Sequence, residues 1–410
     1  MPDVTNRKQD SKNPIESSYV PLRDWLQRYA LSWRFILGAG LLCFCALLIN
    51  PVRTALQTFP GRWMYIFLVS CSLTLWLSSA AVIIATLTGA VDVPDRRKIH
   101  DRPTPRLGGI AVFAGILTAL MMNNIWDPKI ARLIICSGLL FALGVVEDTV
   151  GVSARLRLLT QVVLALFMIY SGVVLKVLPQ DLIVGKAANI VLTVLWFVGI
   201  TNAFNFFDGM DGLASGLAII MSAFLGSIAF LTDQVQLGWV SVAILGSSLG
   251  FLPHNFKLKK PAEIFLGDGG ATLIGFLLAG LAVHGEWAVG HPLLNLSPPL
   301  LIFGVLIYDM FHTTVSRILR GDVRNFRQWI EYTGRDHIHH RFEALLRSKR
   351  YAVILVLVLT FCFGLAATVI RHLSLTLALV LLLQCLVILV IVTILERAGN
   401  IHERRKMSKR

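Results

Sequence analysis

Three oxygen-bearing side chains recur at a fixed spacing in the segment 201–213. Asn205, Asp208 and Asp211 follow one another at intervals of three residues, which on a helical path places them roughly on one side. Carboxylate and amide oxygens are the ligands that a hard cation such as Mg²⁺ prefers. Asparagine, aspartate and glycine also form ordinary turns. The spacing, more than the residue types, therefore favours a functional site.

Acidic residues also border two other apolar segments. Glu147 and Asp148 end the apolar run 141–146, and Asp268 lies in a Gly-Asp-Gly-Gly sequence. Two adjacent acids are suited to holding Mg²⁺ or to proton transfer, because each raises the pKa of the other; an ordinary pair at a helix end is the alternative. Glycines let backbone N–H groups approach phosphate, and Asp268 is a candidate ligand of a metal that bridges it. Arg157, nine residues after Asp148, is suited to neutralising phosphate.

A cluster of histidines and arginines lies in the long connection 319–351. Its members are His337, His339, His340 and Arg341, with Asp309, His312 and Arg317 shortly before them as an extension of the same polar patch. Such a cluster suits a metal or a diphosphate. Zinc is the obvious competitor, but no cysteine accompanies the histidines, and the acids elsewhere favour a hard ion. We therefore favour phosphate binding.

The segment 91–109 is strongly basic. It contains Lys98 and His100, and five Lys or Arg residues fall within 15 positions. This composition suits an anionic ligand, either a pyrophosphate or lipid headgroups, but it is also typical of a simple topology signal. A further connection, 254–266, contains Asn255 and leads to Asp268.

Composition indicates what must position these residues. The 410 residues are 55% hydrophobic and 15% charged, and the mean hydropathy is +0.69, more apolar surface than a soluble core can hide. A membrane-crossing helix needs about 20 apolar residues. Twelve such runs are present, at 35–56, 64–90, 107–125, 130–148, 157–178, 188–205, 213–232, 236–253, 267–287, 298–318, 352–371 and 374–395. The predicted fold is all-α, a polytopic membrane protein of about 11–12 transmembrane helices.

Basic residues predict the orientation of these helices. Lys and Arg gather in every second connection, as expected of cytoplasmic loops. The connections of this set are 91–106, 149–157, 206–212, 254–266 and 319–351; all except 206–212 contain at least two Lys or Arg residues, whereas no connection of the opposite set contains more than one. Both termini are then cytoplasmic, and so is every candidate site residue. Because the +14 charge is divided among these loops, it indicates orientation, and no nucleic-acid partner is expected.

The predicted organisation has four parts. They are a cytoplasmic tail, 1–34; an additional transmembrane helix, 35–63; a polytopic core, 64–395; and a basic cytoplasmic tail, 396–410. Apolar residues repeat at helical intervals between Leu22 and Trp33, which predicts an interfacial helix on anionic lipid, with a disordered tail as the alternative. The polar N-terminus argues against a cleavable signal peptide. All six cysteines lie in apolar runs, so neither a disulfide framework nor a thiolate metal site is expected.

With five motifs in order, residues 64–395 resemble the polyprenyl-phosphate N-acetylhexosamine-1-phosphate transferases of glycosyltransferase family 4. This family includes the enzymes that initiate O-antigen or teichoic acid synthesis and the phospho-MurNAc-pentapeptide translocase. Glu147-Asp148 stands where the family has two aspartates, and Arg157 where it has a lysine. The resemblance implies transfer of N-acetylglucosamine 1-phosphate, or of a related sugar phosphate, from a UDP-sugar to undecaprenyl or another polyprenyl phosphate in the inner or plasma membrane. UMP would be released, and a homodimer is possible.

The resemblance also assigns roles to the oxygen-bearing residues. Asp268 and Asn205 would hold Mg²⁺, with Mn²⁺ as an alternative, and Asp208 and Asp211 would shape the pocket. The catalytic set is then Glu147, Asp148, Asp208, Asp211 and Asp268.

The acceptor and the leaving group have their own implied residues. Asp148, with Glu147, would position or deprotonate the lipid phosphate for attack on the β-phosphorus of the nucleotide. Lys98, Arg157 and the histidine cluster would stabilise the diphosphate as UMP leaves. The substrate-binding set is Lys98, His100, Arg157, Asn255, Asp309, Arg317, His337, His339, His340 and Arg341.

Two other functions fit the composition. A secondary transporter also has many spans with acids at membrane depth, but its sites lie near the midplane between related repeats. In this sequence the acids border one face, and no motif is duplicated. A polytopic scaffold that binds nucleotide without turnover is the third possibility.

Overall fold

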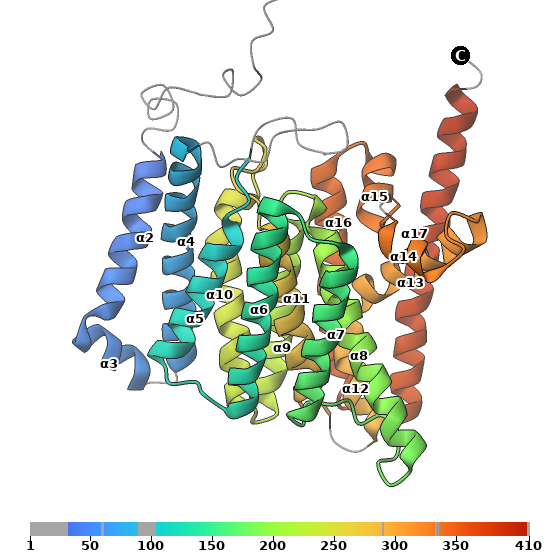
Figure 1. The fold of residues 1–410 in the computed structure, drawn as a ribbon, viewed down its shortest axis with the longest axis horizontal. Coiled ribbons are helices and arrows are strands. Elements are labelled where there is room, and N and C mark those ends of the chain that lie inside the picture. The colour runs from blue at the N-terminus through green and yellow to red at the C-terminus, as the bar shows by residue number, and fades with distance from the viewer. Residues whose placement is uncertain are drawn as a thin grey trace, which may run out of the picture.

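The computed structural model describes residues 32–58, 61–88, 104–288, 291–332, 334 and 336–407. These residues form a bundle of helices (Figure 1) and include no β-strand. The helices are α2 (Ser32–Leu48), α3 (Asn50–Thr58), α4 (Arg62–Thr88), α5 (Gly108–Met122), α6 (Pro128–Val150), α7 (Ala154–Tyr170), α8 (Ile183–Phe206), the 3₁₀ turn η2 (Phe207–Gly209), α9 (Leu213–Leu231), α10 (Val235–Asn255), α11 (Gly267–His284), α12 (Pro292–Ile302), α13 (Gly304–Arg320), α14 (Phe326–Glu331), α15 (Ile338–Leu346), α16 (Lys349–Ile370) and α17 (Leu375–Met407).

Each predicted apolar run coincides with a helix or with a pair of helices. Among the described residues, eight helices are long and apolar enough to cross a membrane. They are α4, α6, α8, α9, α10, α11, α16 and α17. The pairs α2–α3 and α12–α13 reach that length only together, and α5 and α7 are shorter, at 15 and 17 residues. The prediction of an all-α polytopic membrane protein is confirmed.

Two runs predicted as unbroken spans are in fact bent. The run 35–56 bends by 78° between α2 and α3. The run 298–318 contains an 81° bend between α12 and α13. Pro51 lies at the start of α3, where proline is tolerated as a helix begins. At the second bend, a Cβ on Gly304 would lie 2.9 Å from the Phe363 ring. A third run, predicted to reach residue 178, ends at Tyr170 because Gly172 turns the chain with φ 82°.

Short, capped connections fix the ends of the helices near the acidic pair. The α6–α7 connection turns at Gly151, whose φ is 84°, and the Ser153 hydroxyl accepts a hydrogen bond from the Leu156 N–H at the start of α7. This tight turn brings Arg157, in the first turn of α7, back to Glu147 in the last turn of α6.

The helix α11 occupies the core of the bundle. All of its residues except Asp268 and His284 are buried, and it packs against α5, α6, α8 and α9. Its first turn is approached closely by two backbones, because a Cβ on Gly144 of α6 would lie 2.3 Å from the Gly269 Cα, and one on Gly109 of α5 would lie 2.7 Å from the Gly270 Cα. The helices α5, α6 and α11 therefore meet at the first turn of α11, which contains Asp268.

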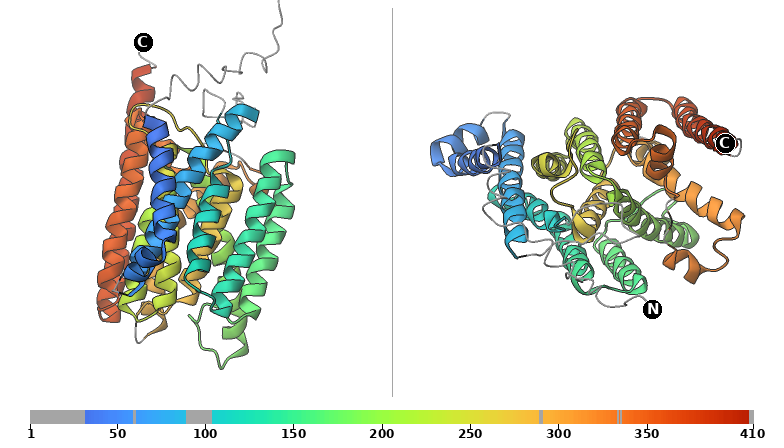
Figure 2. Two further views of the ribbon diagram at one scale, coloured as in Figure 1. Left: turned by 90° about the vertical axis from the view of Figure 1, so that its left-hand side faces the viewer. Right: turned by 90° about the horizontal axis from the view of Figure 1, so that it is seen from above.

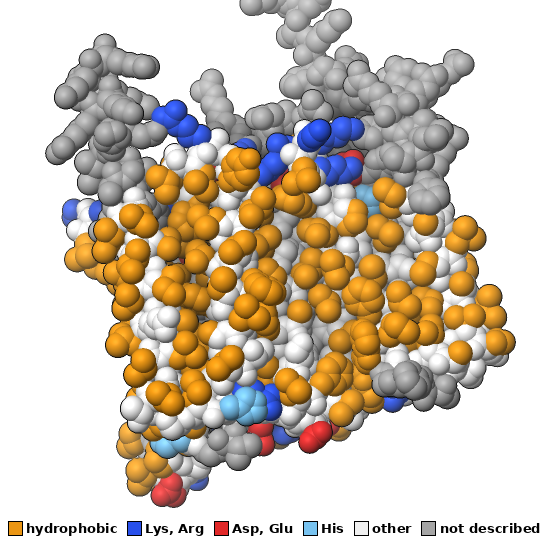
Figure 3. All heavy atoms as spheres, turned by 180° about the vertical axis from the view of Figure 1, so that it is seen from behind, with side chains coloured by type: hydrophobic (Ala, Val, Ile, Leu, Met, Phe, Trp, Pro, Cys, Tyr) orange, Lys and Arg blue, Asp and Glu red, His pale blue; other side chains and the backbone are white. Residues whose placement is uncertain are grey.

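The surface has an apolar belt between two polar ends (Figure 3). The first residue of α2 and the last of α17 lie at the same end of the bundle, the upper end in Figure 1. We call this the basic end; it carries the connections 151–153, 207–212, 256–266 and 321–348. Seen from above, the blue N-terminal helices and the red C-terminal helix lie on opposite sides of the bundle (Figure 2). The belt and the long apolar helices make this a multi-pass membrane protein.

Candidate active site

A cavity of about 900 Å³ opens at the basic end. Four of the oxygen-bearing residues selected from the sequence line it: Asn205, Asp208, Asp211 and Asp268. They come from the end of α8, from the turn that follows it and from the first turn of α11. The structure therefore brings these two separated segments to one cavity wall.

Asp268 and Asn205 are directly paired. The Asn205 amide nitrogen donates a hydrogen bond of 2.8 Å to the Asp268 carboxylate. Asp268 lies in the first turn of α11, where the helix dipole favours negative charge. Gly267 precedes it with φ 78°, a conformation that other residues rarely adopt. The backbone therefore holds this carboxylate at the cavity wall.

Asp148 lies against the same helix start. A Cβ on Gly267 would lie 2.8 Å from an Asp148 carboxylate oxygen, and the other oxygen accepts a hydrogen bond of 3.0 Å from Arg106. The Asp148 side chain is 9% exposed. Its charge repels the charges of Asp208 and Asp268. Three carboxylates thus crowd together, and Arg106 binds one of them, an arrangement that favours binding of a cation.

Glu147 differs from Asp148 in its partner. Its carboxylate accepts a hydrogen bond of 2.7 Å from Arg157, whereas Asp148 is bound by Arg106. The two adjacent acids, predicted to act together, therefore have separate arginine partners. Arg157, predicted to bind substrate, forms an ion pair with Glu147 in this structure.

The helical path predicted for residues 205–211 is interrupted. The helix α8 ends at Phe206, and a 3₁₀ turn and then an extended Met210 follow. Asp211 leaves the helical line and accepts a hydrogen bond of 2.8 Å from the Ala262 N–H. It joins the loop after α10 to the turn after α8, which agrees with the predicted role of shaping the pocket.

Asn255 is fully occupied inside the protein. Its side-chain oxygen accepts hydrogen bonds from the Gly212 N–H at 3.0 Å and from the Ser215 hydroxyl at 2.8 Å, and its amide donates to the Ile264 carbonyl at 3.1 Å. Only 3% of the residue is exposed. Predicted to bind substrate, Asn255 instead ties the start of α9 to the loop before α11.

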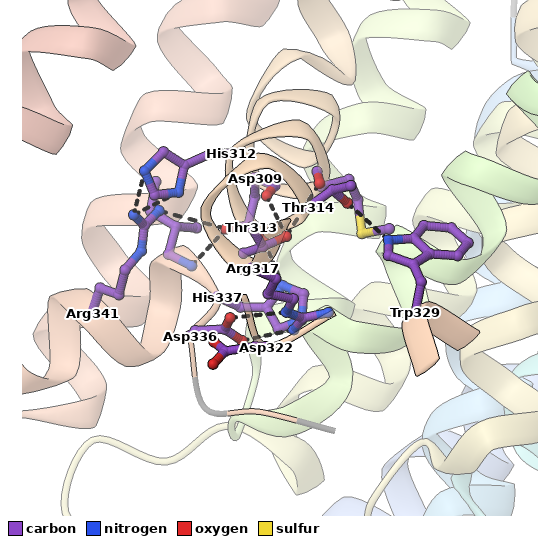
Figure 4. Close-up of polar contacts among 12 residues, drawn as sticks. Asp309, His312, Thr313, Thr314, Arg317, Asp322, Trp329, Asp336, His337 and Arg341 are labelled. Carbon is purple, nitrogen blue, oxygen red and sulfur yellow. Dashed lines mark hydrogen bonds and ion pairs between the residues drawn. The ribbon is translucent and has the colours of Figure 1, made fainter. Parts of the chain in front are cut away.

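The histidine cluster is anchored to α13 (Figure 4). The His337 Nδ1 lies 2.7 Å from the Asp309 carboxylate, and its Nε2 lies 3.3 Å from Arg317. Arg317 also donates two hydrogen bonds to Asp336, at 2.9 and 2.7 Å. Arg341 contacts the His312 ring at 2.9 Å. The residues predicted as one polar patch do lie together.

The surroundings of His339 and Asp336 lower the pKa of both side chains, but for different reasons. Burial, with the positive charge of Arg341 as a smaller cause, lowers the pKa of His339 well below its usual range, so its ring is neutral at neutral pH. Burial alone would raise the pKa of Asp336, but the hydrogen bonds and charge of Arg317 outweigh it and lower the pKa to about 2. His339 is therefore suited to hydrogen bonding rather than to charge neutralisation.

The oxygen-bearing side chains at the cavity fit a Mg²⁺ site that has few protein ligands. The described residues contain no group of three or more His, Cys, Asp or Glu at metal-ligand spacing. Protein Mg²⁺ sites often use only one or two carboxylates, with water and substrate phosphate completing the coordination. Asp268 with Asn205 and Asp208 offers such a set of hard oxygen ligands at the cavity wall. His340 lies 3.6 Å from Glu343, away from these carboxylates along α15.

Some predicted residues lie outside the described ranges. Lys98 and His100 belong to this group, as does most of the predicted interfacial helix before residue 34.

Sequence reasoning missed three contributors to this site. Arg106 binds Asp148, Lys257 lines the cavity, and Phe206 stacks on His337 with ring centroids 4.9 Å apart. The position of Arg106, directly before Leu107-Gly108-Gly109 at a helix start, was a usable signal. Nothing in the sequence pairs Phe206 with a histidine 131 positions later.

Comparison with known proteins decides the family. The glycosyl transferase family 4 model matches residues 130–286. A Bacillus subtilis protein named as a probable undecaprenyl-phosphate N-acetylglucosaminyl 1-phosphate transferase is 31% identical over 351 residues, which cover 84% of this chain and 94% of the relative. The chain belongs to this transferase family. It is therefore a phospho-sugar transferase, and the transporter alternative is not favoured.

Other members of the family are similar over most of their length. A decaprenyl-phosphate N-acetylglucosaminephosphotransferase of Mycolicibacterium smegmatis is 29% identical, over 74% of this transferase and 81% of the relative. An undecaprenyl-phosphate α-N-acetylglucosaminyl 1-phosphate transferase of Yersinia pestis is also 29% identical, over 73% and 81%. The matches extend well beyond the segment 130–286.

Proposed function

We propose that this transferase moves N-acetylglucosamine 1-phosphate from UDP-N-acetylglucosamine to a polyprenyl phosphate, releasing UMP. The supporting observation is the group formed by Asp148, Asp208 and Asp268 with Asn205, at a cavity bordering the apolar belt. A lipid acceptor explains why the site lies at the edge of the membrane-crossing helices. The names of the relatives, which specify undecaprenyl and decaprenyl phosphates and N-acetylglucosamine, support the same substrates.

The proposed reaction is an in-line phosphoryl transfer. An oxygen of the polyprenyl phosphate forms a bond to the β-phosphorus of the nucleotide, and the bond from that phosphorus to the bridging oxygen of UMP breaks. Such reactions need positioning and charge neutralisation more than covalent help from the protein. Asp268 and Asn205 would hold Mg²⁺ or Mn²⁺, which when bound would neutralise the diphosphate.

The remaining residues act on the two substrates. Asp148, fixed by Arg106, positions the lipid phosphate or accepts its proton. Asp208 and Asp211 shape the pocket, and the neutral His339 offers a hydrogen bond to the donor. Lys98 stabilises the diphosphate as UMP leaves, and Glu147 holds Arg157 beside the site.

The cellular setting follows from the same reasoning. The basic connections support a site on the cytoplasmic side of the plasma membrane, where UDP-sugars are made. The product, a polyprenyl-diphospho-sugar, would start a cell-surface polysaccharide such as a teichoic acid or an O-antigen.

The test is UMP release by the purified protein in lipid nanodiscs. We expect release only when UDP-N-acetylglucosamine, polyprenyl phosphate and Mg²⁺ are all present, and we expect chelation to stop it reversibly. Asp268→Asn should lower the rate by a factor on the order of 100 to 1,000, the usual effect of losing one main electrostatic contact. The matched control is Asp322→Asn, in the exposed connection after α13, which should keep the wild-type rate.

Two results would oppose the proposal. Wild-type rates in Asp268→Asn would remove the assigned metal site. Uptake of labelled nucleotide sugar into vesicles without UMP release would favour a transporter.

A further inference from the structure

We propose that Asp309 is a positioning residue that acts through His337, and that this pair sets the place of His339 at the active site without touching the substrates. This inference rests on the proposed function. It divides the histidine cluster into His339, whose ring faces the substrates, and His337, whose ring has a structural role.

The Asp309 carboxylate is completely engaged inside the protein. The residue is 0% exposed. One oxygen lies 2.7 Å from the His337 Nδ1, and the other accepts a hydrogen bond of 2.7 Å from the Ile338 N–H. Ile338 is the first residue of α15, so Asp309 of α13 caps the start of a different helix. Such a capping bond satisfies an N–H that the helix itself leaves without a partner.

These contacts also fix the hydrogen atoms of His337. A carboxylate only accepts hydrogen bonds, so the Nδ1 carries the proton and the Nε2 is left as an acceptor. The Nε2 lies 3.3 Å from an Arg317 guanidinium nitrogen, which donates to it. His337 is 4% exposed. Both of its ring nitrogens are therefore used, and neither is left for a phosphate oxygen.

Arg317 is itself held in place from two sides. It forms a two-pronged ion pair with Asp336, and its guanidinium lies 4.4 Å from the centre of the Tyr332 ring. Figure 4 shows Asp309, Arg317 and Asp336 gathered around His337. The donor to the His337 Nε2 is therefore fixed before any ligand arrives.

His339 has the opposite character. It is 0% exposed, and neither ring nitrogen has a hydrogen-bond partner among the residues that the structure describes. A buried polar group without a partner costs free energy, which points to a hydrogen bond made only with a ligand. The ring packs on Phe207 at 5.2 Å, and its Nε2 lies 3.6 Å from the place of a Cβ on Gly209. Gly209 lines the active-site cavity beside Asp208.

The two rings are linked through the first turn of α15. His337 stacks on Phe206, the last residue of α8, and the His339 ring lies tilted against Phe207 in the turn that follows. Because Asp309 binds both His337 and the Ile338 N–H, it fixes the two residues immediately before His339. A change at Asp309 should therefore displace His339 without removing any substrate contact.

The first experiment compares two replacements of His337. An asparagine amide nitrogen takes the place of the histidine Nδ1, whereas a glutamine amide reaches the place of the Nε2. We expect His337→Asn to retain most of the wild-type kcat/KM for UDP-N-acetylglucosamine, and His337→Gln to lose about tenfold or more, roughly the effect of one lost hydrogen bond. The reverse order would show that the Nε2 contacts the donor, which would overturn the proposal.

The second experiment tests action through His339. We expect Asp309→Asn to lower kcat/KM about tenfold in the wild-type background, but to have little further effect in a His339→Ala background, because residues that act as a unit are not additive. A full additional tenfold loss in that background would contradict the inference. Asp322→Asn, the same change in an exposed carboxylate, should leave kcat/KM unchanged in both backgrounds.

A third measurement does not depend on turnover. Carbethoxylation by diethyl pyrocarbonate, located by mass spectrometry, reports the exposure of each histidine ring. Buried His339 should be protected in the wild type and in Asp322→Ala, and modified several-fold faster in Asp309→Ala. Equal protection in Asp309→Ala would overturn the proposal, while absence of UMP release from the wild type with the expected protection pattern would overturn the proposed function alone.

Discussion

At the scale of single residues, the site is a set of carboxylates with unequal partners. Asp148 is held by Arg106 and Glu147 by Arg157. Among the described residues, the Asp268 carboxylate instead accepts a hydrogen bond from a neutral amide, that of Asn205. Such a distribution leaves negative charge on the α11 side of the cavity and balances it on the α6 side. A cation is expected beside Asp268, and a proton or a phosphate beside Asp148.

The surroundings of His339 predict a pH dependence of stability. Because its pKa is lowered in the folded protein from the usual 6.5, the unfolded chain binds a proton that the folded chain resists. The stabilisation from the neutral buried ring is present above pH 6.5 and is lost as the pH falls below it. His339→Phe keeps a ring on Phe207 but cannot titrate.

The measurement is the thermal midpoint of unfolding from about pH 8 to pH 5. The wild-type midpoint should fall more steeply with decreasing pH than that of His339→Phe. Parallel curves for the two proteins would contradict the burial of a neutral His339.

The sequence predicted the residues of this site better than their contacts. Residue type and spacing were enough to select Asn205, Asp208 and Asp268, because hard oxygen ligands are rare at the borders of apolar helices. The partners of Asp148 and His337 lie 42 and 28 positions away, and pairing over such distances depends on helix packing. For the same reason, the internal role of Asn255 could not be distinguished from substrate binding.

At the scale of elements, glycine contacts determine how closely the helices carrying the acids approach. A Cβ on Gly144 would lie 2.3 Å from the Gly269 Cα, a backbone atom that cannot rotate away. Gly144 lies one turn before Asp148, and Gly269 directly follows Asp268. Separation of α6 from α11 would therefore move the two carboxylates apart.

Gly144→Ala tests this packing. We expect a destabilisation of about 1–3 kcal/mol, typical of overpacking, and a loss of kcat/KM of about tenfold or more, since misplaced catalytic groups are costly. The control is Gly199→Ala in α8, whose added Cβ would meet no atom within 4 Å; it should be tolerated. Wild-type activity in Gly144→Ala would show that the α6–α11 distance does not position the acids.

The helix pattern was also predictable only in part. Apolar run length located each of the eight long apolar helices found among the described residues, because the hydrocarbon thickness sets the length of such a helix. It did not reveal the 81° bend between α12 and α13, which depends on packing of Gly304 against Phe363 of α16. That bend carries Asp309 toward the start of α15, so a feature hidden from hydropathy positions part of the site.

At the scale of the whole molecule, alternation of the helices brings the candidate connections that the structure describes to one end. The basic end carries the connection 256–266, which contains exposed Lys259, and the opposite end carries exposed Asp181 between α7 and α8. The proposed orientation predicts that a membrane-impermeant thiol reagent added to intact cells labels Asp181→Cys and not Lys259→Cys. A protein without its native cysteines is the required background, and labelling of Lys259→Cys alone would reverse the orientation.

The central claim is that a lipid phosphate attacks the β-phosphorus of a nucleotide sugar in the cavity lined by Asp208 and Asp268. The most direct measurement uses UDP-N-acetylglucosamine radiolabelled at the β-phosphorus, with polyprenyl phosphate and Mg²⁺, followed by separation of lipid and nucleotide products. The account predicts that all transferred label appears in a polyprenyl-diphospho-sugar and that the released UMP carries none. Label in free phosphate or in released sugar phosphate, with the lipid unlabelled, would contradict it.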